Sequence, residues 1–280
     1  MKTIEKIDEM ASLSRSLICE KKKIAFVPTM GFLHKGHLSL IKEGKKRGVI
    51  LVVSIFVNPT QFGHGEDFDI YPRDLARDKE LLNQCGVDIL FLPSASDMYS
   101  EGNQTVVDVT ELSQGLCGDS RPGHFRGVTT IVAKLFNIVN PHIAIFGEKD
   151  FQQLAVIKKM VKDLDFNIEI IGMPIVREDD GLAMSSRNHN LSPEERAMAT
   201  SIYQSLKEGY NLCMAGEKNA QAIINEAKKV IASGIEIDYL EIRDSETLLP
   251  VEKIEKEALF AIAAKVGKTR LIDNAIIGRK

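Results

Sequence analysis

The chain has 280 residues, more than the roughly 100 to 200 residues of one domain, so we expect two domains or one with a large appendage. Hydrophobic residues make up 44% and charged residues 27%, which is typical of a globular protein and excludes a disordered or fibrous chain. The formal charge of −3 gives no overall attraction to nucleic acid or anionic lipid, so we expect no nucleic-acid partner.

Targeting and redox signals are weak. The first ten residues carry charges of both signs without an apolar core, and the longest apolar stretch, residues 49–57, is too short to cross a bilayer. We therefore expect a cytoplasmic protein with no membrane association. Cys19, Cys85, Cys117 and Cys213 are scattered without a C-x-x-C pair, which favours reduced structural thiols over a disulfide framework or a zinc site.

Helical periodicity alternates with short runs rich in β-branched residues through the first half of the chain. In chain order these patterns predict a helix over 4–18, a strand over 24–27, a helix over 37–47, a strand over 49–57, a helix over 74–84, a strand over 89–92, a helix over 128–139, a strand over 143–146, a helix over 151–164 and a strand over 168–171. Helical crossovers imply parallel strands, so we predict an α/β fold with a Rossmann-like, doubly wound sheet over residues 1–176.

The pattern changes after Pro174. Residues 178–190 are polar and loop-like, the S-P-E-E at 192–195 marks a helix start, and helices continue to about residue 232. Strands are predicted over 235–242, 258–266 and 270–277. We therefore predict a smaller C-terminal α+β lid domain with an antiparallel sheet over residues 177–280.

The segment V-P-T-M-G-F-L-H-K-G-H joins the first buried strand to a helix. Gly31 and Gly36 lie where the backbone turns or approaches a ligand, and a helix N-terminus offers free N–H groups and a positive dipole end to an anion. His34 and His37 add donors that titrate near neutral pH. Two alternatives stay open: these histidines cap a turn, or they bind a metal, although no third ligand lies nearby.

Further polar residues follow the carboxyl ends of other predicted strands, the edge at which open α/β sheets bind ligands. Gln61 follows the second strand and offers a neutral donor and acceptor. Lys149 follows the strand over 143–146 and can stabilise charge gathering on a transferred phosphate. The loop Met184–Arg187 offers hydroxyls and a guanidinium to phosphate from a mobile lid. The R-P-G-H-F-R-G-V segment at 121–128 suits anion binding or simple turn chemistry, and its role stays open.

Acidic residues near these loops are candidates for holding Mg²⁺, namely Asp78 and Asp150. Because Mg²⁺ commonly relies on substrate phosphates and water, the identity of its protein ligands is not fixed by the pattern. No nucleophilic triad is found in the sequence.

Taken together, the segments V-P-T-M-G-F-L-H-K-G-H, S-I-F-V-N-P-T-Q-F, Y-P-R, R-P-G-H-F-R-G-V, F-G-E-K-D-F-Q-Q and M-S-S-R-N resemble the pantothenate synthetase family, in that family's order and over essentially the whole chain. H-x-G-H by itself indicates only the wider nucleotidylyltransferase superfamily.

The resemblance implies the roles of individual residues. It implies that His37 assists the departure of pyrophosphate, that His34 belongs to the same phosphate-binding loop, that Gln61 and Gln153 bind pantoate, and that Gln61 also lies beside β-alanine. We take His37, His34 and Lys149 as the catalytic residues, and Asp78 as the candidate metal ligand from the residue pattern above. The ATP-binding residues it implies are Met30, Gly31, Phe32, Leu33, His34, Lys35, Gly36, His37, Gly147, Glu148, Lys149, Asp150, Val176, Met184, Ser185, Ser186 and Arg187.

The implied activity is a Mg²⁺-assisted ligation in two half-reactions. The pantoate carboxylate attacks the α-phosphate of ATP and releases pyrophosphate, and the amine of β-alanine then attacks the pantoyl adenylate and releases AMP. The resemblance also implies a homodimer. Two other classes remain as alternatives: a nucleotidylyltransferase that uses the same H-x-G-H loop on a phosphorylated acceptor, and a non-catalytic ATP-binding sensor.

Overall fold

The computed structural model describes residues 1–47, 50–63 and 65–278, and its chain divides into two units. The first unit comprises residues 1–110, 121–148 and 153–174, and the second comprises 111–120, 149–152 and 175–280. Residues 111–120 and 149–152, which lie within the predicted N-terminal domain, therefore belong to the second unit. No pattern in the sequence indicated this assignment. No helix of the described ranges is long and apolar enough to cross a membrane.

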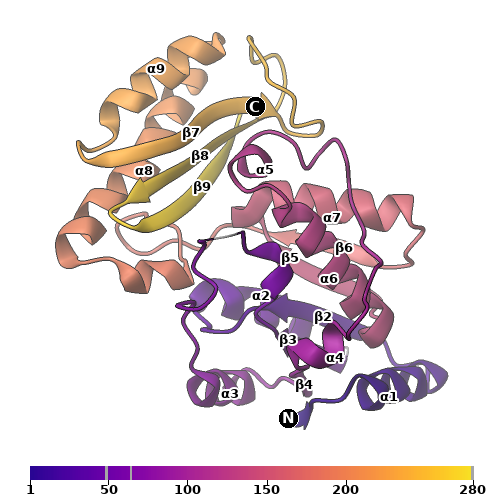
Figure 1. Ribbon diagram of the computed structural model, residues 1–280. Helices are drawn as coiled ribbons and strands as arrows, with labels where there is room; N and C mark the ends of the chain where they lie inside the picture. Colours follow the sequence, from indigo (N-terminus) through magenta and orange to yellow (C-terminus); the bar gives the residue numbers. More distant parts are fainter. Residues whose placement is uncertain (48–49, 64, 279–280) are drawn as a thin grey trace. The chain divides into compact units, whose positions relative to one another are not determined.

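The first unit contains a six-stranded parallel sheet in the order β1-β4-β3-β2-β5-β6 (Figure 1). Its strands are β1 (Lys2–Ile4), β2 (Ile24–Thr29), β3 (Ile50–Ile55), β4 (Ile89–Phe91), β5 (Ile143–Gly147) and β6 (Glu169–Met173). Because β2 lies between β3 and β5, the chain winds outward in both directions from this point. The doubly wound α/β prediction is confirmed, and the carboxyl ends of β2 and β5 form the switch point where such sheets bind ligands.

Helices cover both faces of this sheet because alternate residues of its strands point to opposite sides. Ile24 and Phe26 of β2 belong to one apolar core, and Ala25 and Val27 belong to the other. The strand is therefore buried on both faces, which explains its unbroken apolar sequence. The helices that begin in or belong to this half of the chain are α1 (Ile7–Cys19), α2 (Lys35–Lys46), α3 (Leu75–Gln84), α4 (Ala95–Met98), α5 (Cys117–Ser120), α6 (His124–Val139) and α7 (Phe151–Asp163).

Most boundaries agree with the predictions to within two residues, and two helix starts differ by more. The helix predicted over 4–18 begins at Ile7, because Lys2–Ile4 pairs with β4 as an edge strand. The helix predicted over 128–139 begins at His124, since Gly123 in a left-handed conformation starts it one turn earlier. Val49, where the second strand was predicted to start, lies outside the described residues, and β3 is described from Ile50.

The second unit contains an antiparallel sheet in the order β7-β8-β9, as predicted. The strands are β7 (Ile235–Asp244), β8 (Ala258–Val266) and β9 (Thr269–Ile277), and the helices are α8 (Pro193–Met214) and α9 (Ala220–Val230). The S-P-E-E signal is a true helix start, because the side chains of Ser192 and Glu195 form a reciprocal capping box.

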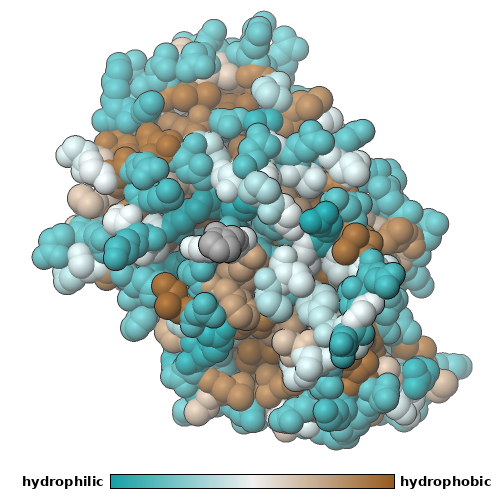
Figure 2. All heavy atoms as spheres, viewed as in Figure 1, coloured by the Kyte–Doolittle hydropathy of each residue, from teal (hydrophilic) through white to brown (hydrophobic). Residues whose placement is uncertain are grey.

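Close packing of α8 on the sheet depends on a glycine. A Cβ at Gly209 would lie 2.2 Å from Cε1 of Phe260, so only glycine lets the helix backbone approach β8 this closely. The buried faces of α8, α9 and the sheet form one apolar core. In Figure 2 hydrophobic side chains are visible where α9 meets β7, while hydrophilic side chains cover the outer side of α9.

Candidate active site

The loop that follows β2 is held by a carboxylate from α3. Asp78 accepts hydrogen bonds from the backbone N–H groups of Phe32 and Leu33, each at 2.7 Å. Gly31 and Phe32 have φ angles of +83° and +50°, and this left-handed turn points successive N–H groups to the same side. A side chain 45 or 46 residues away thus fixes the conformation of the predicted phosphate loop.

His34 and His37 lie at the start of α2 and cap it. Nδ1 of His34 accepts from Gly36 N at 3.1 Å, and Nδ1 of His37 accepts from His34 N at 3.3 Å. Because each Nδ1 is an acceptor, the proton of each neutral imidazole resides on Nε2. The rings lie 4.1 Å apart, centroid to centroid. The capping alternative and the phosphate prediction are therefore compatible, since capping through Nδ1 turns Nε2–H into a donor.

Gln61 lies in a short 3-10 helix, η1 (Pro59–Gln61), directly after β3. Its Oε1 accepts from Asn58 Nδ2 at 3.1 Å, and its Nε2 donates to the sulfur of Met30 at 3.3 Å. Asn58 is only 1% exposed and also accepts from the hydroxyl of Tyr99 at 2.8 Å. The amide of Gln61 is thus held in one orientation beside the loop after β2.

Gln152 and Gln153 are adjacent in sequence but differ in their surroundings. Gln152 is buried, accepts from Cys117 N, and donates to three backbone carbonyl groups of residues 112–115. No hydrogen bond of the Gln153 side chain is found within the described residues. Gln152 is therefore saturated by structural bonds, whereas the amide of Gln153 is available to a ligand. Gly147, at the carboxyl end of β5, has open space beside its Cα.

Lys149 and Asp150 belong to the second unit, in the 3-10 helix η2 (Glu148–Asp150), whereas Gly147 and Glu148 belong to the first. The backbone carbonyl of Lys149 accepts from Asn274 Nδ2 at 2.9 Å, which ties this residue to β9. Within the ranges that the structure describes, no carboxylate forms an ion pair with the ammonium group of Lys149. The charge of Lys149 acts on the carboxylate of Asp273, which itself pairs with Arg177. A half-buried ammonium without a direct ion pair is suited to binding a phosphate.

The remaining predicted ATP-binding residues lie in the second unit, before α8. Val176 accepts from Met184 N at 3.0 Å, which closes the loop, and Ser185 Oγ accepts from Arg187 N at 3.2 Å as the cap of η3 (Ser186–Asn190). Asn188 Nδ2 donates to Glu178 and to the Ala183 carbonyl.

The loop is also anchored by an ion pair that sequence patterns missed. Arg177 donates to both carboxylate oxygens of Asp273, at 2.6 and 3.0 Å, and stacks on the ring of Tyr203. Burial raises the pKa of Asp273, although Arg177 acts in the opposite direction. The partners are 96 residues apart, so no local signal could have identified the pair.

Asp78 has a structural role that the sequence did not predict, and its role as a metal ligand stays a prediction. Both of its oxygens are engaged by backbone N–H groups and the residue is 1% exposed. Burial raises the pKa of Asp78 above its usual range, although the two N–H bonds lower it. Among the described residues, no group of three or more His, Cys, Asp or Glu side chains could hold a metal ion.

Comparisons with known proteins agree with the fold and with these motifs. The model of a family described as pantoate-beta-alanine ligase matches residues 2–276. The chain belongs to this family. The resemblance of the motifs is therefore confirmed, as is the expectation of a ligase.

Relatives from several bacteria match over their full length. The pantothenate synthetase of Thermotoga petrophila is 55% identical over 99% of this chain and 100% of its own, and that of Geobacter sulfurreducens is 54% identical over 100% of both. The crystal structure of pantothenate synthetase from Thermus thermophilus superposes with a TM-score of 0.93 at 43% identity, covering 98% of this chain and 99% of that one.

A further solved structure contains ligands. The pantoate-beta-alanine ligase of Francisella tularensis, complexed with beta-gamma ATP and beta-alanine, has a TM-score of 0.81 and 38% identity to this chain, with 99% and 97% of the two chains covered.

Proposed function

We propose that this protein condenses pantoate with β-alanine at the expense of ATP, releasing AMP and pyrophosphate through a pantoyl adenylate. The observation that carries the proposal is the family match over residues 2–276, in which the motif loops follow the carboxyl ends of β2, β3 and β5. Acyl adenylation needs no protein nucleophile. It needs aligned reactants and stabilisation of charge on the transferred phosphate.

We propose that the loop over Met30–His37 binds ATP phosphates. The N-terminus of the 12-residue helix α2 and the two Nε2–H donors favour anions, while the turned backbone of the loop is held in place by Asp78. His34 and His37 would stabilise the departing pyrophosphate as donors through Nε2–H.

Lys149 is proposed to stabilise the charge that gathers on the α-phosphate during attack, because its ammonium forms no direct ion pair with a carboxylate of the described residues. Gly147, Glu148, Asp150, Val176 and the Met184–Arg187 loop complete the proposed set of ATP-binding residues. The lid role of residues 177–280 stays a prediction.

Gln61 and Gln153 are proposed to bind pantoate, and Gln61 to lie beside β-alanine. A neutral amide orients hydroxyl and carboxylate groups without neutralising the attacking carboxylate. A fixed orientation suits this task, since misalignment of a nucleophile lowers the rate steeply.

The proposal has three further parts. We propose that Mg²⁺ is carried by the phosphates of ATP, because Mg²⁺ commonly relies on substrate phosphates and water, and Asp78 stays the candidate protein ligand. The expected homodimer can be checked by sedimentation. The cytoplasmic location stays a prediction.

The test is pyrophosphate release from Mg·ATP with pantoate and β-alanine, omitting each reactant in turn, with mass detection of pantothenate and AMP. Product that requires all three reactants supports the proposal. ATP binding without turnover favours the sensor, and a dinucleotide-like product favours a nucleotidylyltransferase. Lys149→Ala should lower the rate of pyrophosphate release by orders of magnitude, about 100-fold or more, while Lys207→Ala, at an exposed lysine of α8, serves as the control.

A further inference from the structure

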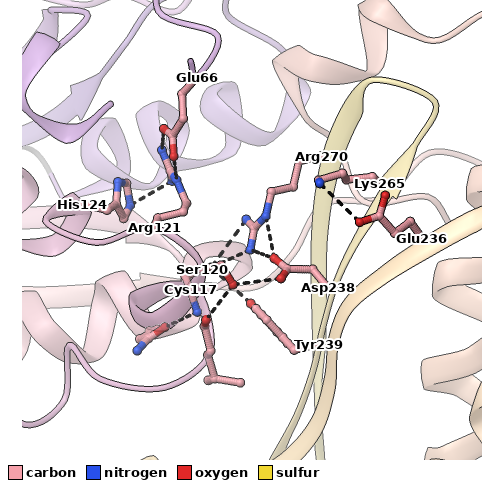
Figure 3. A network of polar contacts seen from close by, with 12 residues as sticks. Glu66, Cys117, Ser120, Arg121, His124, Glu236, Asp238, Tyr239, Lys265 and Arg270 are labelled. Atoms are coloured by element: carbon pink, nitrogen blue, oxygen red, sulfur yellow. Dashed lines mark hydrogen bonds and ion pairs between the residues drawn. The ribbon is translucent and has the colours of Figure 1, made fainter. Parts of the chain in front are cut away.

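The segment R-P-G-H-F-R-G-V at residues 121–128 leads into the first turn of α6. The side chains of Arg121 and His124 both contact the backbone carbonyl of Gln61. All of these residues lie in the first unit. Figure 3 shows Arg121 between the carboxylate of Glu66 and the ring of His124.

Arg121 is held on one side by a bidentate ion pair. Its Nε and Nη2 donate to the two carboxylate oxygens of Glu66 at 2.8 and 2.6 Å. The same Nη2 donates to the carbonyl of Gln61 at 3.3 Å. Burial raises the pKa of Glu66, but the hydrogen bond and charge of Arg121 outweigh it, so the net pKa lies below the usual range. Glu66 is therefore ionised at neutral pH and holds the guanidinium in place.

His124 contacts the same carbonyl from a second direction. Nη1 of Arg121 lies 3.2 Å from His124 Nε2, and His124 Nδ1 lies 2.8 Å from the oxygen of Gln61. Because a guanidinium only donates, Nε2 of the neutral ring accepts from it, and Nδ1–H then donates to Gln61. Arg121 thus also sets the tautomer of a buried histidine.

Gly127 lets α6 lie directly against η1. A Cβ at this position would lie 2.3 Å from the oxygen of Thr60 and 2.7 Å from the nitrogen of Gln61. The carbonyl of Gly127 accepts from Asn58 Nδ2, which also donates to the side chain of Gln61. The segment therefore fixes the backbone of Gln61 directly and its side chain through Asn58.

We propose that Arg121, His124 and Gly127 are positioning residues for Gln61, with Glu66 locking Arg121, and that they set the affinity for pantoate and β-alanine. The inference rests on the proposed role of Gln61. Two hydrogen bonds to one carbonyl and an orienting bond to the amide restrict Gln61 before substrate arrives, so less ordering entropy is lost on binding. This role requires only the contacts to Gln61 and Asn58, and no contact with the nucleotide.

The experiment measures dissociation constants for pantoate and for ATP by titration calorimetry, which does not depend on turnover. Arg121→Lys keeps the positive charge but loses the planar guanidinium and its several N–H donors. It should weaken pantoate binding about tenfold, while ATP binding changes less than about twofold. Glu66→Gln should weaken pantoate binding about threefold. Arg243→Lys is the matched control, because Arg243 forms a similarly buried pair with Glu241 and makes no contact with Gln61.

A double-mutant cycle separates positioning from a general loss of structure. In a Gln61→Ala background, Arg121→Lys should cause no further loss of pantoate affinity, because the side-chain amide that Arg121 positions has been removed. Additive losses, or equal losses for ATP and pantoate, would overturn the inference. Normal pantoate affinity in Gln61→Ala would overturn both this inference and the proposed role of Gln61. An effect of Gln61→Ala without one of Arg121→Lys would overturn the inference alone.

Discussion

The two loops predicted to bind ATP phosphates are stabilised in different ways. The loop after β2 depends on Asp78, 45 or 46 residues further along the chain. The loop before α8 has local hydrogen bonds, since Ser185 caps Arg187 and Asn188 bonds to Glu178 and Ala183, all within 10 residues, in addition to the distant Arg177–Asp273 ion pair. The difference teaches that local turn chemistry builds much of one loop, whereas the other acquires its conformation only when the sheet and α3 have assembled.

The physical reason is the backbone conformation of the first loop. Gly31 and Phe32 both have positive φ angles, which point N–H groups toward one side and leave them without partners of their own secondary structure. A buried carboxylate satisfies two of them at once. Substitutions in this loop should therefore cost more than substitutions in the loop before α8.

The largest effect is expected for Asp78→Ala, which leaves the N–H groups of Phe32 and Leu33 unsatisfied. We expect a loss of about 2–4 kcal/mol in the free energy of unfolding and a fall of at least about 100-fold in adenylate formation, by denaturant titration and ATP–pyrophosphate exchange. Asp88→Ala is the control, because Asp88 accepts from Leu51 N outside this loop. Similar exchange rates in the two variants would contradict the role assigned to Asp78.

A somewhat smaller effect is expected for Gly31→Ala. The new Cβ would lie 2.9 Å from Cγ2 of Ile55 and occupy a backbone with φ of +83°. We expect a loss of about 1–3 kcal/mol, measured by thermal and denaturant unfolding. Gly102→Ala separates the two causes, since Gly102 has φ of +80° and open space around it. Equal losses at both glycines would show that φ strain alone matters.

Asn188→Ala tests the second loop. It removes two hydrogen bonds, to Glu178 at 3.1 Å and to the Ala183 carbonyl at 3.0 Å, and should cost about 1 kcal/mol by denaturant titration. The exposed Asn83 provides a control through Asn83→Ala. A loss as large as that of Asp78→Ala would remove the distinction between the loops.

The smallest effect is a difference in pH dependence. Burial raises the pKa of Asp78, whereas the hydrogen bond from Arg196 lowers the pKa of Asp180 in the second loop. The stability that Asp180 contributes is present above its unfolded pKa of about 3.9 and is lost as pH falls through its lower folded pKa. For Asp78 the sign is opposite, and stability falls as pH rises from about 3.9 through its higher folded pKa.

Unfolding free energies measured from about pH 3 to 6 would check this contrast. The difference between wild type and Asp180→Asn should shrink toward the acid end. As pH rises, the free energy of unfolding of wild type should fall relative to that of Asp78→Asn, because only the aspartate loses a proton. Parallel curves for the two variants would contradict the assigned shifts.

Residue patterns predicted both sheets, the helix start at Ser192 and the positions of the ligand loops after β2, β3 and β5. They did not predict β1, because three residues are too few to show a strand period and only pairing with β4 defines them. They suggested Asp78 as a metal ligand and did not predict its hydrogen bonds to the loop after β2, because contacts between residues so far apart leave no local pattern.

By itself, the sequence determined the elements, their order and the family, because hydrophobic periodicity, capping and motif spacing are local properties. Only the tertiary structure decided which side chains hold Gln61 and the loop after β2. His124 reaches Gln61 across 63 residues and Asp78 reaches Leu33 across 45. Such contacts depend on the strand order, which places distant loops at one edge of the sheet.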